Sequence, residues 1–537
     1  MTSPSFNLID QPWILVRTLA GDVKLRSIRA TLVDAHQLRG LAGEIPTQDI
    51  AVLRVLIAVI LSATRPEQQR SQHEALSFFT ALWQSGQLPI ETLDDYLNKV
   101  SDRFDLLDPA RPFYQVAGLT TDSGKRTGLT KLIADVPAGH AFFTTRAGAA
   151  LDSLSLPEAA RWLIHCMAFD PSGIKTGASG DVRVKGGKGY PFGYPAWAGN
   201  IGSVVAHGSS LFETLALNTP WLMSHPLDLP LWERPLNGPG IAEDHPLPMG
   251  PADLCTWPSR RLRLFLTGDR VTDVQISNGD KLGPQNLHPF EFMSAWRHSK
   301  TQSKAGADVL MPVLHQPARR IWQGLGPLLL RGGEVGQSLP APVIDWLAVL
   351  EYEGVLPPDL TVDLQVCGLE YGTQNSVIVG GADDRLTAAV TTLTDPILAQ
   401  EVVTAAMQAR DGVVALANLA GNLDRASGGE GNARERTFEV GYALLDRPFR
   451  TWVKQLTDAS TLESNRAVWA TSASGILMRA AQSLIHDAGP AAMVGRNVSQ
   501  PGKDDLMLLD AGRAEIWFRA ALFKTFPPKA QPSEETP

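Results

Sequence analysis

Cysteine is scarce in this chain, and its cysteines are not spaced as a zinc site requires. The 537 residues include only Cys166, Cys255 and Cys367, which lie far apart and form no CxxC pair. This pattern excludes a thiolate zinc site and is typical of proteins in a reducing cytoplasm. We therefore expect a cytoplasmic protein that holds no metal and no other cofactor.

Long apolar runs are also absent. The longest one, residues 55–61, is far shorter than the roughly 20 residues that a helix needs to cross a bilayer. The first residues, MTSPSFNLIDQPW, lack the charged start and apolar core of a secretory signal. We expect no contact with a membrane.

An excess of positive charge is missing as well. The net charge is −8 at pH 7, which argues against a nucleic-acid coat protein or a basic tail. Any contact with DNA or RNA therefore has to come from local patches. The hydrophobic fraction of 44% and the charged fraction of 19% are those of a globular protein. A chain of this length is expected to form two to four domains.

The common catalytic motifs are absent too. A P-loop would need glycine in place of Val182 and serine or threonine in place of Gly189. The glycines form no GxGxxG motif that opens a helix, and residues 177–180 lack the spacing of a GxSxG nucleophile elbow. The eleven histidines are scattered, and His165, within an apolar helix, is expected to pack in a core. We predict no catalytic residue and a protein that is not an enzyme.

What the chain does contain is a stretch rich in glycine and cations, at residues 171–194. Seven of its residues are glycine, four are lysine or arginine, and one is acidic. Glycine allows positive φ angles and lets another molecule approach the backbone closely. Lysine and arginine residues among such glycines indicate that the molecule that binds there is a polyanion. The alternative is an ordinary solvated surface loop.

Periodicity predicts an α+β fold in which a large mixed domain with β-hairpins and helices precedes a C-terminal four-helix bundle. We expect the mixed domain at residues 1–380, the bundle at 385–526 and a disordered tail at 527–537. A hairpin is predicted from strands 260–266 and 271–277. Helices are predicted at 47–63, 73–84, 90–100, 157–169, 202–217, 318–330 and 343–353, and the bundle helices at 385–408, 434–456, 467–488 and 512–526.

Several short segments resemble one protein family, in order and in spacing. They are FNLIDQPWILVR at 6–17, FDLLDPARPFYQ at 104–115, FDPSGIK at 169–175 with the glycine stretch after it, YGTQN at 371–375 and LLDRPFRTW at 444–452. Together they resemble the CasA family, the large subunits of the type I-E CRISPR Cascade surveillance complex. The resemblance covers nearly the whole chain.

This resemblance implies a non-catalytic subunit that recognises a short duplex motif, the PAM, and starts strand separation, while guide-RNA pairing supplies sequence specificity. A glycine loop that approaches the minor groove falls on Gly173, Lys175, Gly177, Gly180, Lys185 and Lys188. A lysine finger falls on Lys281, and a wedge that parts the first base pair falls on Gln374 and Asn375. A contact with the 5′ handle of the guide RNA falls on Phe142 and Arg146.

The resemblance also implies partners. They are the backbone and small subunits of Cascade, the CRISPR guide RNA 5′ handle, target double-stranded DNA, and a helicase–nuclease that the large subunit recruits. The family includes members with a cysteine-rich, zinc-finger-like insertion before the lysine finger. Only Cys255 lies there in this chain, so no zinc is expected.

Residue chemistry alone leaves other readings open. One is a stand-alone enzyme that binds a phosphorylated metabolite in the glycine stretch, with Lys188 as the charge partner. Another is a scaffold whose helical bundle binds only protein partners. Lys281 would then be a solvated surface lysine, Gln374 and Asn375 ordinary turn residues, and Phe142 a core residue.

Overall fold

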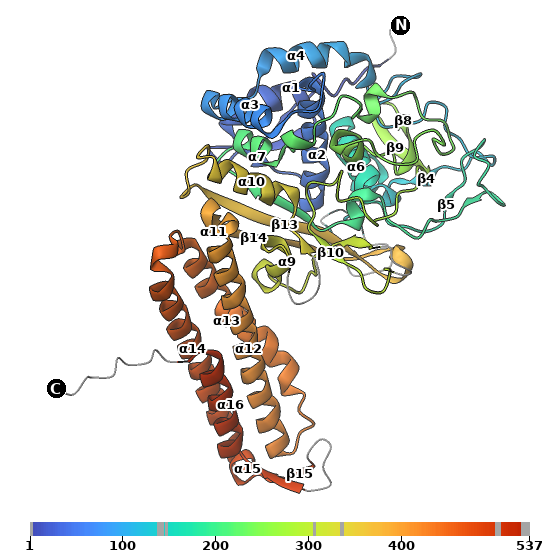
Figure 1. The fold of residues 1–537 in the computed structure, drawn as a ribbon. Helices are drawn as coiled ribbons and strands as arrows, with labels where there is room; N and C mark the ends of the chain where they lie inside the picture. Colours follow the sequence, from blue (N-terminus) through green and yellow to red (C-terminus); the bar gives the residue numbers. More distant parts are fainter. Residues whose placement is uncertain are drawn as a thin grey trace. The chain divides into compact units, whose positions relative to one another are not determined.

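The computed structural model describes residues 4–136, 144, 146, 149–303, 308–332, 338–499 and 506–527, which fall into two compact units. The first unit comprises Met1–Arg319, Leu330–Leu356 and Val362–Arg385. The second unit comprises Arg320–Leu329, Pro357–Thr361 and Leu386–Pro537. The first is a mixture of helices and small sheets, and the second is mainly long helices (Figure 1). The predicted α+β class with a C-terminal helical bundle is confirmed.

Helix α2 (Pro46–Ala63) forms the centre of the first unit. Its side chains from Ile50 to Leu61 are all buried, and all of them except that of Arg54 are apolar, so that every side of the helix can face the core. It packs against α6 (Leu156–Phe169) and α8 (Pro251–Cys255). By length and composition α2 could cross a membrane, but most of it is enclosed by the unit, as in the core helix of a globular protein.

Three other helices of the first unit begin and end within one or two residues of their predicted bounds. Helix α3 (Gln72–Ser85) begins at a capping box in which Ser71 and Glu74 bond each other's backbone amides. It ends at Gly86, whose φ of 68° closes the last turn. Helices α4 (Ile90–Lys99) and α10 (Pro342–Tyr352) also lie where periodicity places them.

The sheets of the first unit are small and antiparallel. Strands β8 (Arg260–Thr267) and β9 (Arg270–Asn278) form the predicted hairpin, with Thr267 opposite Arg270. The sheet order is β4-β9-β8, and a second sheet has the order β14-β13-β7. The latter contains β7 (Ser203–His207), β13 (Thr361–Tyr371) and β14 (Ile378–Ala389).

The remaining described α-helices and strands of the first unit are short. They are β1 (Ile14–Thr18), β2 (Val23–Arg26), α1 (Ile28–Val33), β3 (Leu38–Leu41), β4 (Thr127–Gly128), α5 (Ala149–Asp152), β5 (Lys175–Thr176), β6 (Lys188–Gly189), α7 (Leu211–Asn218), β10 (Trp296–His298), β11 (Leu310–Pro312) and β12 (Ser338–Leu339).

Two predicted helices, at residues 202–217 and 318–330, are wrong. Residues 202–217 form strand β7 and then helix α7, because Val204 and Val205 pair with β13 before the chain turns at Gly208. Residues 318–330 form only the single turn Ile321–Gly324 and the short α9 (Gly326–Leu329), since Gly324, Gly326 and Pro327 interrupt the pattern.

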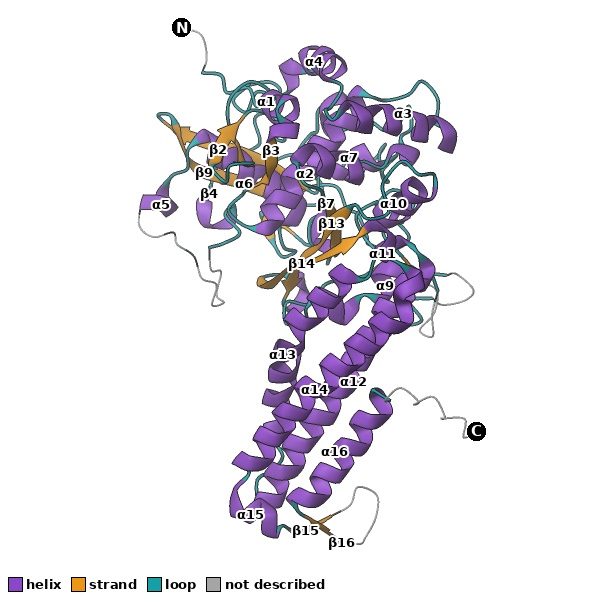
Figure 2. Cartoon of the chain, turned by 90° about the vertical axis from the view of Figure 1, so that its left-hand side faces the viewer, coloured by secondary structure: helices purple, strands orange, loops and turns teal. Residues whose placement is uncertain are grey.

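The second unit is built around α12 (Pro396–Ser427), which contacts α13 (Ala433–Gln455), α14 (Leu462–Asp487) and α16 (Ala511–Thr525) (Figure 2). The side chain of Asp395 caps α12 by accepting bonds from the amides of Ile397 and Leu398. Rings of Phe449, Trp452 and Trp469 pack within 5.2–5.8 Å of one another between α13 and α14. The unit also contains α11 (Val390–Thr394), α15 (Gly489–Val494), β15 (Arg496–Ser499) and β16 (Leu506–Leu509).

The first bundle helix differs from its predicted bounds. Residues 385–389 extend strand β14, and α12 begins only at Pro396 and continues to Ser427. Proline favours the first turn of a helix, so Pro396 marks the start. The predicted tail begins at Pro527, and residues 528–537 lie outside the described residues.

A buried ion pair fixes α2 inside the first unit. The guanidinium of Arg54 donates two hydrogen bonds of 2.9 Å to the carboxylate of Glu291, and both side chains are at most 1% exposed. The indole of Trp197 donates to the same carboxylate at 2.7 Å. A buried charge without its partner is strongly destabilising, so this pair should anchor the core.

We expect Glu291→Gln to lower the free energy of unfolding of the first unit by about 3–5 kcal/mol, because Arg54 keeps a buried charge that nothing balances. Asp102→Asn is the matched control, since Asp102 pairs with Arg111 at an exposed site. This control should cost about 1 kcal/mol or less. Urea denaturation measures both, and equal costs for the two variants would contradict the anchoring role.

Candidate nucleic-acid interface

The glycine stretch folds as a small β-hairpin. Strands β5 and β6 pair through Lys175–Gly189 and Thr176–Lys188. Lys185 and Lys188 exchange backbone hydrogen bonds of 3.0 and 3.1 Å across the turn. Gly186 and Gly187 between them have φ angles of 58° and 73°, the conformation of a type I′ turn. Two of the seven glycines are therefore required by the turn itself.

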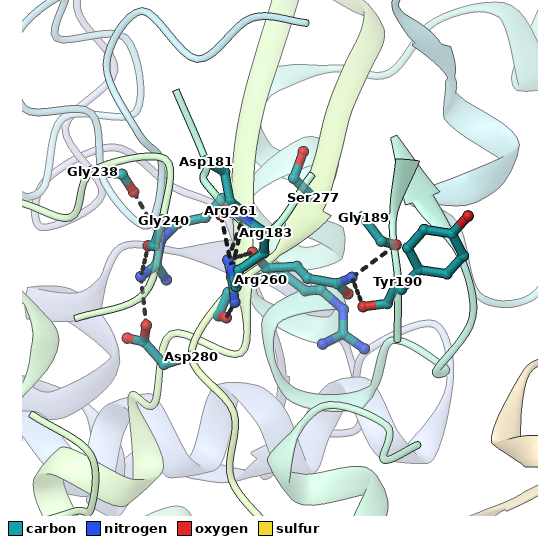
Figure 3. A network of polar contacts seen from close by, with 12 residues as sticks. Asp181, Arg183, Gly189, Tyr190, Gly238, Gly240, Arg260, Arg261, Ser277 and Asp280 are labelled. Carbon is teal, nitrogen blue, oxygen red and sulfur yellow. Dashed lines mark hydrogen bonds and ion pairs between the residues drawn. The ribbon is translucent and has the colours of Figure 1, made fainter. Parts of the chain in front are cut away.

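The hairpin is tied to the end of β9 by polar contacts. Arg183 bonds both carboxylate oxygens of Asp181 and also the backbone oxygens of Asn278 and Gly279, at 3.0 and 2.9 Å. The amide side chain of Asn278 donates in turn to the backbone oxygens of Gly189 and Tyr190. Figure 3 shows this network beside the strand that carries Ser277. Arg183 is thus engaged within the protein.

Lys175, the first cation of the hairpin, is engaged as well. Its ammonium lies 2.5 Å from Asp170, and Arg260 of β8 bonds the same carboxylate. Burial opposes the charge of Asp170, but Lys175 and Arg260 still hold the pKa of this carboxyl below its usual range. Burial also lowers the pKa of Lys175. Lys185 and Lys188, by contrast, are exposed at the hairpin turn.

The turn between β13 and β14 has an unusual backbone. Gln374 and Asn375 have consecutive φ angles of 59° and 53°, which residues other than glycine rarely adopt. Hydrogen bonds from Gly372 to Val377 and from Asn375 to Gly372, both 2.9 Å, close the turn. The Gln374 side chain is exposed at its tip. A polar side chain therefore projects from a tightly bonded turn.

This turn and the glycine stretch are joined at both ends of the stretch. The amide of Ser172 donates to the backbone oxygen of Asn375 at 2.7 Å. The side chain of Asn375 donates to the backbone oxygen of Gly193 at 3.0 Å. Two segments about 200 residues apart in sequence therefore form one surface of the first unit.

Lys281 lies beside the same surface. It is exposed, and its ammonium is 6.0 Å from the ring centre of Phe192, within the glycine stretch. Its neighbour Asp280 points inward and pairs with the buried Arg261 at 2.7 Å. This pair fixes the backbone from which Lys281 extends. The structure thus brings together the predicted glycine loop, lysine finger and wedge.

Of the two residues in the predicted RNA contact, the structure describes only Arg146. Phe142 lies outside the described residues. Arg146 is only 11% exposed and forms ion pairs with Glu44, Asp135 and Glu158. Its charge is therefore balanced within the protein.

Sequence reasoning missed the residues that anchor the surface, above all Asp170 and Asn278. Asp170 is the acid of the FDPSGIK segment, and its position before Pro171 at the end of a helix was the available signal. His165 lies in the core, as expected. Its ring bonds the hydroxyl of Thr47 at 2.9 Å, and burial lowers its pKa to about 3. Among the described residues, no group of three or more histidines, cysteines and acids is placed to hold a metal ion.

Comparisons with known proteins point to one family. The family model of CRISPR-associated protein Cse1 matches residues 7–480. A curated relative from Thermus thermophilus, CRISPR-associated protein CasA/Cse1, is 29% identical over 343 residues, and the match spans 62% of this chain and 62% of that relative's length. The crystal structure of Thermobifida fusca Cse1 is 38% identical, with 98% of both chains covered and a TM-score of 0.88.

The fold also occurs within a larger assembly. A chain of a solved CRISPR RNA-guided surveillance complex matches 90% of this chain over its own full length, with a TM-score of 0.64. At 20% identity this match shows a common fold.

We expect Gly187→Ala to destabilise the hairpin by about 1–2 kcal/mol, because alanine disfavours the left-handed conformation. Gly187→Asn should cost less, since asparagine tolerates that conformation. Gly238→Ala is the control, because Gly238 has ordinary φ and open space around its Cα. Hydrogen exchange at the amides of Lys185 and Lys188 is the measurement. Exchange that is equally fast in all three variants would contradict the turn.

Proposed function

Because the chain belongs to the CRISPR-associated Cse1 family, we propose that it is the large, non-catalytic subunit of a cytoplasmic Cascade surveillance complex that reads a PAM in double-stranded DNA and begins strand separation. Membership in the family confirms the resemblance found in the sequence segments. The observation that carries the proposal is the surface formed by the glycine stretch, Lys281 and Gln374. Duplex binding and duplex opening need neighbouring sites, and this surface offers both.

The glycine stretch and Lys281 are proposed to read the minor groove. Base edges in that groove are mainly hydrogen-bond acceptors, so backbone amides and a lysine suit them. Gly180 is exposed and has a φ of 86°, so its backbone can approach a partner without a side chain in the way. The exposed Lys185 and Lys188 would meet phosphates, whereas Lys175 would hold the hairpin in place through Asp170.

Gln374 is proposed to be the wedge. Its side chain projects from a turn that is closed by its own backbone bonds and attached to the glycine stretch by Asn375. If the glycine stretch holds a duplex, Gln374 would therefore contact that duplex at a fixed position along the duplex axis. Parting one base step costs a few kcal/mol, which groove contacts and guide-RNA pairing can offset.

The remaining partners of the proposed complex follow from the family resemblance. They are the backbone and small subunits, the guide RNA 5′ handle and the helicase–nuclease. Phe142 is proposed to stack on a base of the handle, with Arg146 nearby as a positioning residue. The match to a chain of an RNA-guided surveillance complex supports assembly into such a particle.

The double variant Lys185→Ala, Lys188→Ala should weaken duplex binding by the assembled complex for any sequence. Loss of two phosphate contacts should also reduce the slope of log K against log salt by about 2. Lys99→Ala is the control, because Lys99 is exposed on α4 and belongs to no part of this surface. Fluorescence anisotropy across a salt series measures both. An unchanged slope in the double variant would show that these lysines do not meet phosphate.

Replacing Gln374 by glycine should slow strand opening while initial duplex binding stays within about twofold of the original affinity. Glycine accepts the left-handed conformation, so the turn keeps its shape and loses only the projecting side chain. Thr373→Ala is the matched control, since Thr373 is exposed on the same turn. Permanganate footprinting of the base pairs next to the PAM follows the opening. Opening at the normal rate in Gln374→Gly would rule out the wedge.

A further inference from the structure

The first unit contains a cavity of about 370 Å³ directly behind the wedge turn. Its walls come from the end of α6, residues 127–136, the start of the glycine stretch and residues 376–378. Most of a nucleoside fits in a cavity of this volume. The cavity lies between the glycine stretch and the wedge turn, the two segments proposed to touch DNA, so its lining can indicate which part of the DNA it would bind.

The lining of the cavity combines apolar side chains with polar groups. Ile174, Val377 and Ile378, which are exposed or half-buried, supply the apolar contacts. Ser172 is also a lining residue, and its hydroxyl oxygen is buried and has no hydrogen-bond partner among the residues that the structure describes. A buried hydroxyl without a partner is uncommon in folded proteins and calls for an explanation. A flat ligand with a polar edge would provide one.

The cavity is adjacent to the wedge through short contacts. Ser172 donates its amide to Asn375, and a Cβ placed on Gly173 would lie 3.9 Å from the Cβ of Ser376. Ser376, which follows the wedge residues directly, is itself part of the lining. A base pushed out of the duplex by Gln374 would therefore find this cavity next to it. Lys131 is exposed and lines the cavity too, so it can face the phosphate of the same nucleotide.

We propose that this cavity receives the base of the first nucleotide of the displaced DNA strand. The inference rests on the proposed function, since it assumes that Gln374 opens the duplex. An unpaired base loses its stacking partners, and enclosure against the aliphatic side chains of Ile174, Val377 and Ile378 replaces part of that contact. The Ser172 hydroxyl bonds the polar edge of the base. Capture of this base slows reclosure of the duplex, so that guide-RNA pairing has time to begin.

The test uses the assembled complex with its guide RNA and a target duplex that carries 4-thiothymidine at the first displaced position. Irradiation should crosslink this base to peptides that contain residues 165–176 or 376–378. Ala134→Trp fills the cavity, because Ala134 is one of its lining residues. We expect at least a fivefold loss of crosslink yield in this variant. Ser123→Trp is the control, because Ser123 is exposed and is not a lining residue, and its crosslink yield should stay within twofold of the original.

Thr130→Trp provides a second filling variant if Ala134→Trp does not assemble, since Thr130 is exposed and also lines the cavity. Ser172→Ala should reduce the yield without loss of stability, because it removes a buried hydroxyl that has no partner. Initial duplex affinity, measured separately, should remain within twofold in every variant.

Three results would overturn the inference. The crosslink could map to peptides elsewhere, its yield could persist in both filling variants, or a thio-substituted base of the guide RNA could occupy the cavity instead. A complex that binds no duplex would instead refute the proposed function, and the affinity measurement identifies that case.

Discussion

The candidate interface depends on one carboxylate, that of Asp170. It lies at the end of α6, pairs with Lys175 of the glycine stretch at 2.5 Å and accepts a bond from Arg260 of β8. The backbone at the same place accepts further bonds, from Ala196 to Asp170 at 2.9 Å and from the Tyr371 hydroxyl to Phe169 at 2.6 Å. The end of one helix thus joins the glycine stretch, the β8–β9 hairpin and the β13–β14 hairpin. Each of these three segments is therefore held by buried contacts at the end of α6 and extends from there to the surface.

This arrangement would reconcile the acidic net charge of the chain with the nucleic-acid partner that we propose. The net charge of −8 would repel DNA at long range, so attraction has to be local. Arg183, Lys175 and Arg260 balance buried acids and build the scaffold. Lys185, Lys188 and Lys281 remain exposed above it. Cations that lie close together in sequence therefore divide into buried or half-buried, paired residues and exposed residues that are available to a partner.

The sequence was sufficient where local signals dominate. Helices α2, α3 and α10 follow from apolar periodicity, and the β8–β9 hairpin follows from its turn residues. The helix predicted at residues 202–217 was wrong because their apolar pattern suits a strand as well as a helix. Pairing of β7 with β13, about 160 residues later, selects the strand. Strand β14 continues past residue 385 for a similar reason, because it pairs in the same sheet with β13, which lies outside the predicted helix.

The composition of the candidate site could be predicted, but its construction could not. Glycines and lysines mark residues 171–194 in any reading, and family resemblance marks Lys281 and Gln374. The I′ turn of the hairpin is a local feature of Gly186 and Gly187. The bonds from Arg183 to residues 278 and 279 and from Ser172 to Asn375 span about 95 and 200 positions. No pattern within a single segment encodes such distant partners.

The two adjacent left-handed residues at the β13–β14 turn limit which side chains evolution can place there. Glycine, asparagine and aspartate fit this backbone with little strain, and a straight side chain such as that of glutamine fits at a modest cost. A valine, isoleucine or threonine would force another turn type, and the tip would then point in a new direction. Positions 374 and 375 can therefore vary only among a few residue types, even where a bulkier side chain would be an advantage.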